Sequence, residues 1–280
     1  MSSVWAGPLP AAFPPQELAI FQLPTGSYRT RAVFAVAGGS VFDTRHLAAT
    51  AVLVRHPKGD LLIDAGFGAR VVEHVAMLPR FERAPLERAS TAREQLDAAD
   101  YDVSRLLGVV VTHVHWDHVS GLDSLDVPVW INGDEVGYGV DDSHGAVFRA
   151  VSQGRQTHQY VMESVPYLGF PASLDVHGDG SVVIAHAGGH TPGSVVVFVT
   201  LPSGERYGFI GDITWQCDGI THRKQRPWFM RGMTDVDPAG VRVGLDRCIA
   251  LRDVVHLVPA HDLGAYASIP LFPGSAGSGV

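Results

Sequence analysis

Cysteine is scarce in this chain. Cys217 and Cys248 are the only two, and they lie far apart without forming a CxxC pair. A small secreted domain held together by disulfides would normally carry more cysteines. We therefore expect two ordinary thiols in a reducing compartment, and a cytoplasmic protein.

Long apolar runs and basic blocks are also missing. No uninterrupted apolar run approaches the roughly 18 residues that a membrane-spanning helix needs. Residues 1–21 have no basic region, and prolines interrupt their apolar stretches, so no signal peptide is expected. Lys and Arg number 21 against 29 Asp and Glu, spread along the chain without a basic stripe. These features argue against nucleic acid and against a membrane surface as partners.

No Pro, Gly or Ser-rich linker divides the interior of the 280-residue chain. Hydrophobic residues make up 46% and charged residues 18%, which is typical of a globular protein with a sizeable core. We expect a single domain over residues 1–280, with its core at about 45–265. An N-terminal arm, 1–25, and a C-terminal tail, 266–280, would flank this core, and the last ten residues, LFPGSAGSGV, would be mobile.

Apolar runs bounded by turn residues predict strands at 49–56, 60–64, 109–113, 181–187, 194–200 and 206–212, and a last strand that ends at His261. Helices are predicted at 70–78, 91–99 and 237–252, the second with a capping box of Thr91 and Glu94 and the third capped by Asp237 before Pro238. Residues 133–178 are less regular and predict a helix with a loop that covers the substrate. His and Asp recur where strands end, which indicates that several strand ends meet at one place.

The stretch VVVTHVHWDHVSGL, 109–122, crowds three histidines and an aspartate behind a buried strand. Residues i and i+2 of an extended segment point to the same side, so His113 and His115 can reach one ion. Asp117 and His118 follow as the chain turns into a helix, and they can reach a second ion. A purely structural role would bury these groups without a counter-ion, which desolvation penalises heavily. The pattern predicts a metal site.

Further ligand candidates stand at three other strand ends: His190 in GGHTPGS, Asp212 in GFIGDIT and His261 in VPAHD. Nitrogen and oxygen ligands without thiolate suit zinc, with iron, manganese and cobalt as alternatives. We assign the remaining histidines to the surface or the core; they are His46, His56, His74, His144, His158, His177, His186, His222 and His256.

Five motifs in this order, namely DAGFG, THVHWDH, GHTPGS, GD and a late histidine, resemble those of the metallo-β-lactamase superfamily over residues 50–262. The resemblance implies an α/β fold, a four-layer αβ/βα sandwich of two mixed sheets with helices outside and a site along one sheet edge. It also implies two metal ions. His113, His115 and His190 would hold the first, Asp117, His118 and His261 the second, with Asp212 as a bridge and Asp64 orienting ligands through hydrogen bonds.

Two ions about 3.5 to 4 Å apart can share a water and lower its pKa to roughly 7, so that a bridging hydroxide attacks a carbonyl. Asp117 could then carry a proton to the leaving group, and Asp212 would hold both ions. No GxSxG motif indicates a serine hydrolase instead. The stretch DAGFGAR lacks the third glycine of a dinucleotide-binding turn, because Val71 stands there. The sequence therefore predicts a metal-dependent hydrolase of a small molecule.

The motif order looks most like that of the acyl-homoserine lactonases, and a bridging aspartate argues against a true β-lactamase. One departure is Trp215, which stands where several of those lactonases carry a tyrosine that assists at the substrate carbonyl. An organophosphate or phosphodiester hydrolase is an alternative, since Trp215, Trp228 and Phe229 could form a pocket for an aryl leaving group.

Further alternatives stay open. A glyoxalase II-like thioesterase is one, although such enzymes usually add a basic C-terminal domain. A non-catalytic or redox metal-binding module is another, although redox relatives replace one histidine of the HxHxDH stretch with a carboxylate. The basic segment HRKQRPWFMR, 222–231, is either a solvated loop or a pocket rim that attracts an anionic substrate. A homodimer, as many relatives form, stays open as an alternative to a monomer.

Overall fold

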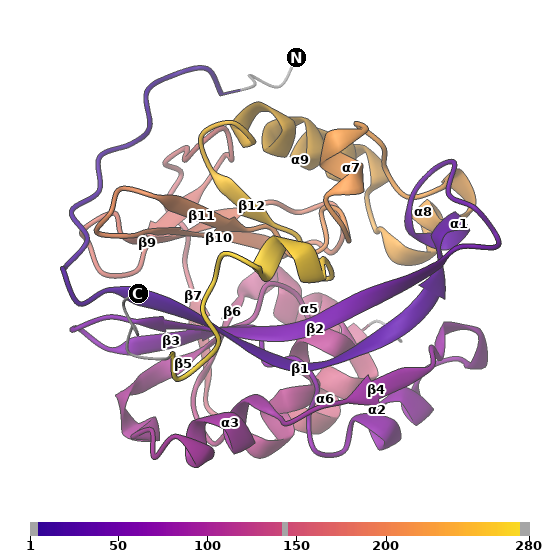
Figure 1. Cartoon of the computed structure of the whole chain (residues 1–280), viewed down its shortest axis with the longest axis horizontal. Helices are drawn as coiled ribbons and strands as arrows, with labels where there is room; N and C mark the ends of the chain where they lie inside the picture. The colour runs from indigo at the N-terminus through magenta and orange to yellow at the C-terminus, as the bar shows by residue number, and fades with distance from the viewer. Residues whose placement is uncertain (1–4, 142–144, 275–280) are drawn as a thin grey trace, which may run out of the picture.

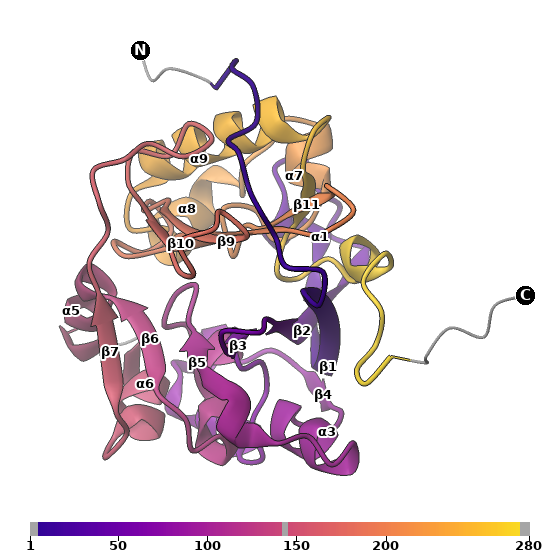
Figure 2. The same ribbon diagram turned by 90° about the vertical axis from the view of Figure 1, so that its left-hand side faces the viewer.

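The computed structural model describes residues 5–141 and 145–274. Its strands form a seven-stranded sheet in the order β4-β1-β2-β3-β5-β6-β7 and a five-stranded sheet in the order β12-β11-β10-β9-β8. The two sheets face each other (Figure 1). Helices α7 and α9 cover the outer face of the smaller sheet, and α2, α3 and α6 cover that of the larger one (Figures 1 and 2). The expected four-layer sandwich is confirmed.

The strands of the larger sheet are β1 (Ala19–Arg31), β2 (Thr44–Arg55), β3 (Asp60–Ile63), β4 (Leu86–Arg88), β5 (Leu106–Val110), β6 (Val129–Asn132) and β7 (Thr157–Tyr160). Those of the smaller sheet are β8 (Ser173–Asp175), β9 (Val182–His186), β10 (Val195–Thr200), β11 (Arg206–Phe209) and β12 (His256–Val258).

The α-helices are α1 (Ala32–Ala35), α2 (Val71–Met77), α3 (Ala92–Ala98), α4 (Trp116–Val119), α5 (Gly133–Asp141), α6 (Ala146–Ser152), α7 (Asp218–Thr221), α8 (Trp228–Thr234) and α9 (Pro238–Leu251). Short 3-10 turns are η1 (Arg80–Glu82), η2 (Val103–Arg105), η3 (Ser120–Ser124) and η5 (Leu263–Tyr266). In the described part of the chain, no helix has the length and apolar character that crossing a membrane requires.

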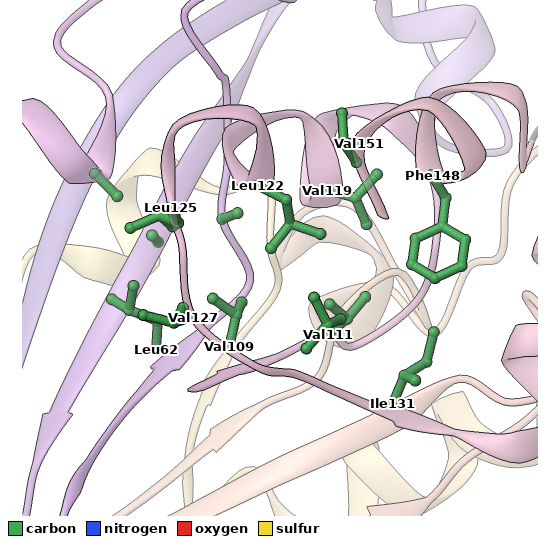
Figure 3. Packing of buried hydrophobic residues seen from close by; sticks show 14 of the residues in the cluster. Leu62, Val109, Val111, Val119, Leu122, Leu125, Val127, Ile131, Phe148 and Val151 are labelled. Carbon is green, nitrogen blue, oxygen red and sulfur yellow. The ribbon is translucent and has the colours of Figure 1, made fainter. Parts of the chain in front are cut away.

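Three apolar layers hold the sandwich together. Successive side chains of a strand point to opposite faces of its sheet and so enter different layers. In β3, Leu62 packs toward the helices of the larger sheet, whereas Leu61 and Ile63 pack between the two sheets. In β10, Val197 points between the sheets and Phe198 points toward α9. Figure 3 shows the helix-facing side of the larger sheet. Because both faces of these strands are buried, the sequence shows continuous apolar runs instead of alternation.

Several predicted caps are present. Thr91 Oγ1 accepts a hydrogen bond from the Glu94 N–H, and the Glu94 carboxylate accepts one from the Thr91 N–H, so the capping box of α3 is confirmed. Asp237 caps α9 by accepting from the Ala239 N–H. The ends of most predicted elements shift by a few residues. The strand predicted at 109–113 is β5, which ends at Val110.

The N-terminal arm predicted for residues 1–25 is wrong from Ala19 onward. Residues 19–31 form β1, which pairs with β2 on one side and with β4 on the other. Pro24 and Gly26 suggest a loop, but they stand at a register shift in the β1–β2 ladder. Such a bulge tolerates residues that would break a regular strand.

The C-terminal tail predicted for 266–280 is also wrong over its described part. Tyr266 and Ile269 are buried between the sheets, and Gln22 donates its N–H to the Pro270 carbonyl at 2.9 Å. Phe272 packs edge-on against Phe21, with ring centroids 5.8 Å apart. Apolar contact with β1 therefore holds this segment on the sandwich. Residues 275–280, like His144, lie outside the described residues.

The segment 133–178, predicted as helix plus loop, joins the two halves of the sandwich. It contains α5 and α6, then β7 at the end of the larger sheet and β8 at the end of the smaller one. The chain thus crosses from one sheet to the other in this segment.

The apolar layer of Figure 3 allows a test of the packing. We expect Leu125→Ala to lower the free energy of unfolding by about 2–5 kcal/mol, because Leu125 is fully buried and the truncation leaves a cavity. Urea denaturation measures the change. The matched control, Leu263→Ala at a 53% exposed position, should stay within about 0.5 kcal/mol of the unmodified protein. Equal losses in the two variants would contradict this description of the core.

Candidate metal centre

The strand ends of both sheets deliver polar side chains to one edge. In the larger sheet β3 and β5 are parallel, and Asp64 and His113 follow their ends. In the smaller sheet β11 and β12 are parallel, and Asp212 and His261 follow theirs. His190 lies in the loop between β9 and β10. All five side chains are buried.

The backbone after β5 turns from one sheet toward the other. Thr112 accepts a hydrogen bond through its carbonyl from the N–H of Val195 at the start of β10, with an N–O distance of 3.0 Å. This contact explains why the strand ends earlier than the apolar run predicts. It also places the histidines that follow Thr112 between the two sheets.

Three groups of side chains bring their ligand atoms within 4.8 Å of one another. These groups are His113, His115 and His190; His113, His118 and Asp212; and Asp117, His118 and His261. All seven ligand candidates from the sequence therefore lie together. None of the eight other histidines that the structure describes belongs to these groups.

Hydrogen bonds to one ring nitrogen determine which nitrogen faces the cluster. His261 Nδ1 lies 2.7 Å from the carbonyl oxygen of Ala48, which can only accept, so Nδ1 carries the proton. His118 Nδ1 lies 2.7 Å from the Asp64 carboxylate. In both rings Nε2 is the nitrogen that faces the cluster, which is the arrangement found around metal-binding histidines.

Asp64 is held firmly enough to orient His118. Its carboxylate accepts from the Thr112 N–H at 2.7 Å and from the Thr112 hydroxyl at 2.8 Å, as well as from His118. Its φ of 55° lies in the left-handed region, which is uncommon outside glycine and which aspartate tolerates better than most residues. These contacts hold the ring so that His118 Nε2 lies 3.4 Å from Asp212 Oδ1.

Asp212 lies between the group that contains His190 and the group that contains His261. Its Oδ1 is 3.1 Å from His261 Nε2, and its Oδ2 is 3.5 Å from His190 Nε2. Burial alone would raise the pKa of this carboxyl, but the His261 and His118 rings outweigh burial and hold it well below its usual range. Asp212 is therefore an ionised carboxylate within reach of both groups.

The buried polar atoms of the cluster fit divalent cations. Within the described residues, His113 Nε2, His118 Nε2 and Asp212 Oδ1 are buried and have no hydrogen-bond partner. Leaving such an atom unpaired costs about 1–3 kcal/mol, and converging lone pairs also repel one another. Burial, followed by the neighbouring His118 and His190 rings, lowers the pKa of His113 well below its usual value, so this ring is a neutral donor. Cations would satisfy all of these atoms at once.

A buried ion pair, absent from the sequence-based prediction, supports His190. The ring donates from Nδ1 to the Asp235 carboxylate at 2.9 Å, and Asp235 also pairs with the Arg226 guanidinium. Although burial would raise the pKa of Asp235, Arg226 and His190 lower it. Arg226 also donates to the Asp212 carbonyl oxygen at 2.9 Å.

Arg226 corrects the prediction for the basic segment 222–231. Its side chain is buried beneath the metal-ligand cluster, neither in a solvated loop nor on a pocket rim, and residue 226 as a whole is only 3% exposed. His222, Arg223 and Lys224 of the same segment are exposed, as a solvated loop requires. The charge pattern of the segment could not distinguish the buried Arg226 from its exposed basic neighbours, because the sequence gives no sign that Asp235 lies beside Arg226.

Glu135 is a second residue that sequence reasoning missed. Its buried carboxylate accepts from the Val114 N–H at 2.8 Å and, through the other oxygen, from the Gly193 N–H at 2.9 Å. It thereby joins the HxHxDH loop to the GHTPG loop. Gly193 is required here, since a Cβ would come within 2.4 Å of the Glu135 backbone nitrogen. Burial raises the pKa of Glu135 to about 7, against the lowering effect of its donors.

A cavity of about 780 Å³ opens onto this cluster. His115, Asp117, His190 and Asp212 form its polar floor. Its apolar walls include Phe34, Leu78, Phe81, Trp215, Phe229, Met230 and Met233. Its volume falls within the range that is typical of small-molecule sites, about 300–1,000 Å³.

Two of the three predicted pocket aromatics line this cavity. The indole N–H of Trp215 donates to Asp212 Oδ2 at 2.8 Å, so this ring touches the ligand cluster directly. Phe229 packs edge-on against Phe34, with centroids 6.2 Å apart. Trp228 is 81% exposed and is not among the described residues that line the cavity. Its ring points out from α8. The prediction that Trp228 belongs to the pocket is therefore wrong.

An αββα sandwich with a histidine and aspartate cluster along one sheet edge defines a class of metal-binding hydrolase folds. The sequence model described as "Metallo-beta-lactamase superfamily" matches residues 44–261, which is most of the chain. The chain therefore belongs to the metallo-β-lactamase superfamily.

Individual relatives differ in what their names say. The chain is 30% identical over 153 residues to the acyl-coenzyme A thioesterase MBLAC2 of Bos taurus, a match that covers 51% of each. The chain thus spans about half the length of that relative. It is 23% identical over 240 residues to the N-acyl homoserine lactonase AttM of Rhizobium johnstonii, covering 79% of this chain and 84% of that one.

A solved structure supports the fold. The crystal structure of a quorum-quenching N-acyl homoserine lactone lactonase superposes with a TM-score of 0.72 at 13% identity. The superposition covers 94% of this chain and 99% of the lactonase chain. At this identity the likeness establishes the shared architecture and not a shared substrate.

The bridge made by Glu135 generates a prediction. We expect Glu135→Gln to weaken metal binding by about tenfold or more, because an amide has one accepting oxygen and would turn an NH₂ group toward the other backbone N–H. Competition with a fluorescent chelator measures the affinity. Glu73→Gln, on the exposed face of α2, is the matched control and should leave affinity unchanged. Unaltered metal affinity in Glu135→Gln would show that the link between the two ligand loops does not support metal binding.

Proposed function

We propose that the protein is a two-metal hydrolase that cleaves the ester bond of an acylated lactone or a related ester. One observation carries the proposal: a buried cluster of seven histidine and aspartate ligand candidates lies beside a cavity with apolar walls, and four of the seven line its floor. Chemistry at the floor and an acyl chain along the walls account for both features.

The ligand assignment is part of the proposal. His113, His115 and His190 would hold one ion, and Asp117, His118 and His261 the other. Asp212 lies near both groups and is suited to bridge them. A ligand set of five imidazoles and two carboxylates without a thiolate favours zinc. Two unpaired cysteines suit the cytoplasmic location that we propose.

When bound, two such ions supply an activated water at neutral pH and polarise the carbonyl under attack. The chain itself contributes orientation and proton handling. Asp117 lines the cavity, with its Oδ2 3.5 Å from His261 Nε2, so it is placed to carry a proton to the departing alkoxide. Trp215 and Arg226 hold Asp212 from its side-chain and backbone ends.

The cavity walls favour an aliphatic acyl group. Phe34, Phe229 and Met233 come from α1 and α8, which stand together at one end of the molecule (Figure 1). Methionine side chains adapt to flexible ligands, and each buried methylene contributes about 0.8 kcal/mol. The N-acyl homoserine lactonase among the relatives has a substrate of this description in its name.

An acyl thioester with an anionic carrier is the second candidate. Arg29 and Arg31 line the same cavity as the apolar side chains. The Arg29 side chain is half exposed and its ion pair with Glu87 is long, at 3.9 Å, so it can contact phosphate groups. The relative named as an acyl-coenzyme A thioesterase supports this candidate.

Substrate rates distinguish the candidates. We expect zinc-reconstituted protein to prefer a long-chain acyl-homoserine lactone over an aryl phosphotriester and an acyl-coenzyme A by at least 100-fold in kcat/KM, which is about 2.7 kcal/mol. Extending the acyl chain should raise kcat/KM by up to about fourfold per methylene, until the cavity is filled. A leading rate for the thioester would select the second candidate, and a leading rate for the phosphotriester would reject both.

The bridging role of Asp212 is tested separately. We expect Asp212→Ala to lose at least one metal ion per chain and to reduce kcat by several orders of magnitude, because the carboxylate reaches both ligand groups. Elemental analysis and initial rates measure the two effects. Asp253→Ala, at an exposed carboxylate, is the control. Two ions and near-normal turnover in Asp212→Ala would refute the assignment.

A further inference from the structure

Trp215 is already committed to the metal-ligand cluster. An indole has a single N–H, and that of Trp215 donates to Asp212 Oδ2 at 2.8 Å. The Arg226 guanidinium lies over its ring at 5.3 Å from the centroid. Because these two contacts hold the Trp215 ring and use its only N–H, the side chain has no donor left for a substrate. Any side-chain hydrogen-bond donor to a substrate at this end of the cavity must therefore be another residue.

Tyr28 presents a hydroxyl to the same floor from the opposite sheet. It lines the cavity, and its Oη lies 3.4 Å from His261 Nε2. Because His261 donates from Nδ1 to the Ala48 carbonyl, Nε2 is the nitrogen that faces the ligand cluster. The phenol therefore lies beside the Asp117, His118 and His261 group. The Asp117 carboxylate is the other hydrogen-bond partner of this hydroxyl. A metal held by His261 and Asp117 would engage both partners and leave the hydroxyl proton for another acceptor.

The position of Tyr28 is fixed by its surroundings. It stands within β1, opposite Leu47 of β2 and Leu86 of β4, so both neighbours in the sheet hold its backbone. Its ring packs against Trp116, with centroids 5.4 Å apart, and only 9% of the residue is exposed. A donor that is fixed in advance is most effective against charge that develops during a reaction.

We propose that Tyr28 is a catalytic residue whose hydroxyl donates a hydrogen bond to the scissile ester group of the substrate, in place of the donor that Trp215 cannot supply. This inference rests on the proposed function, since it needs an ester bound at the cavity floor. It moves the donor from the loop after β11 to β1 of the other sheet.

Tyr28→Phe removes the hydroxyl and keeps the ring. We expect kcat for an acyl-homoserine lactone to fall about 100-fold, as on removal of one donor to a developing oxyanion, with KM changed less than threefold. Metal content should stay at the level of the unmodified protein. The matched control is Tyr207→Phe, in β11 of the smaller sheet and not among the residues that line the cavity, whose hydroxyl lies 3.4 Å from that of Ser268. Its rates should not change.

Binding of decanoate to the zinc-reconstituted protein gives a readout that needs no turnover. A hydrogen bond to a charged carboxylate contributes about 1.5–3 kcal/mol, so calorimetry should find decanoate bound more than tenfold more weakly by Tyr28→Phe. Unchanged kcat with unchanged decanoate affinity would overturn the inference, and so would a loss of metal in Tyr28→Phe. If the unmodified protein hydrolyses no lactone but decanoate binding depends on the hydroxyl, the proposed function fails while the contact between Tyr28 and a ligand stands.

Discussion

The buried carboxylate of Asp212 among converging imidazoles is the interaction on which the rest of this structure depends. Lone pairs and a negative charge cannot be taken out of water together unless something positive lies between them. Three of the rings have a fixed partner on their outer nitrogen: Asp64 for His118, Asp235 for His190 and a carbonyl for His261. His113 Nε2, His118 Nε2 and Asp212 Oδ1 are left without a partner, and all three belong to one group of converging ligand atoms.

The ligands of that cluster come from both sheets, so the two sheets must keep a fixed position relative to each other. The hydrogen bond from Val195 to Thr112 joins the sheets at the site edge, and Glu135 joins the two ligand loops. Val197 and Ile63 both belong to the apolar layer between the sheets, which holds the sheets against each other. Packing thus gives the site its dimensions, while the hydrogen bonds orient individual rings. Rigid elements hold a metal geometry better than loops alone.

The metal ligands could be predicted from the sequence because their signals are local. His113 and His115 share a side of an extended segment, and His190, Asp212 and His261 each follow an apolar run. The strand β1 could not be predicted, because Pro24 and Gly26 look like breakers until the bulge is known. Arg226, Asp235, Glu135 and Tyr28 were missed for a different reason. Each acts through partners far away in sequence, and no residue type, spacing or charge run marks a contact of that kind.

The residues that line the cavity fall into two sets, those inside the superfamily match and those outside it. The superfamily match begins at residue 44, so it includes all seven ligand residues but not Tyr28, Arg29, Arg31 or Phe34, which line the cavity from β1 and α1. The floor of the site therefore lies within the segment that the superfamily model matches, while part of its wall comes from a segment that the match leaves out. A change in that segment can alter which group is held over the floor without disturbing a single ligand. Substrate choice in this protein should accordingly depend on β1 and α1 at least as much as on the motifs that identify the superfamily.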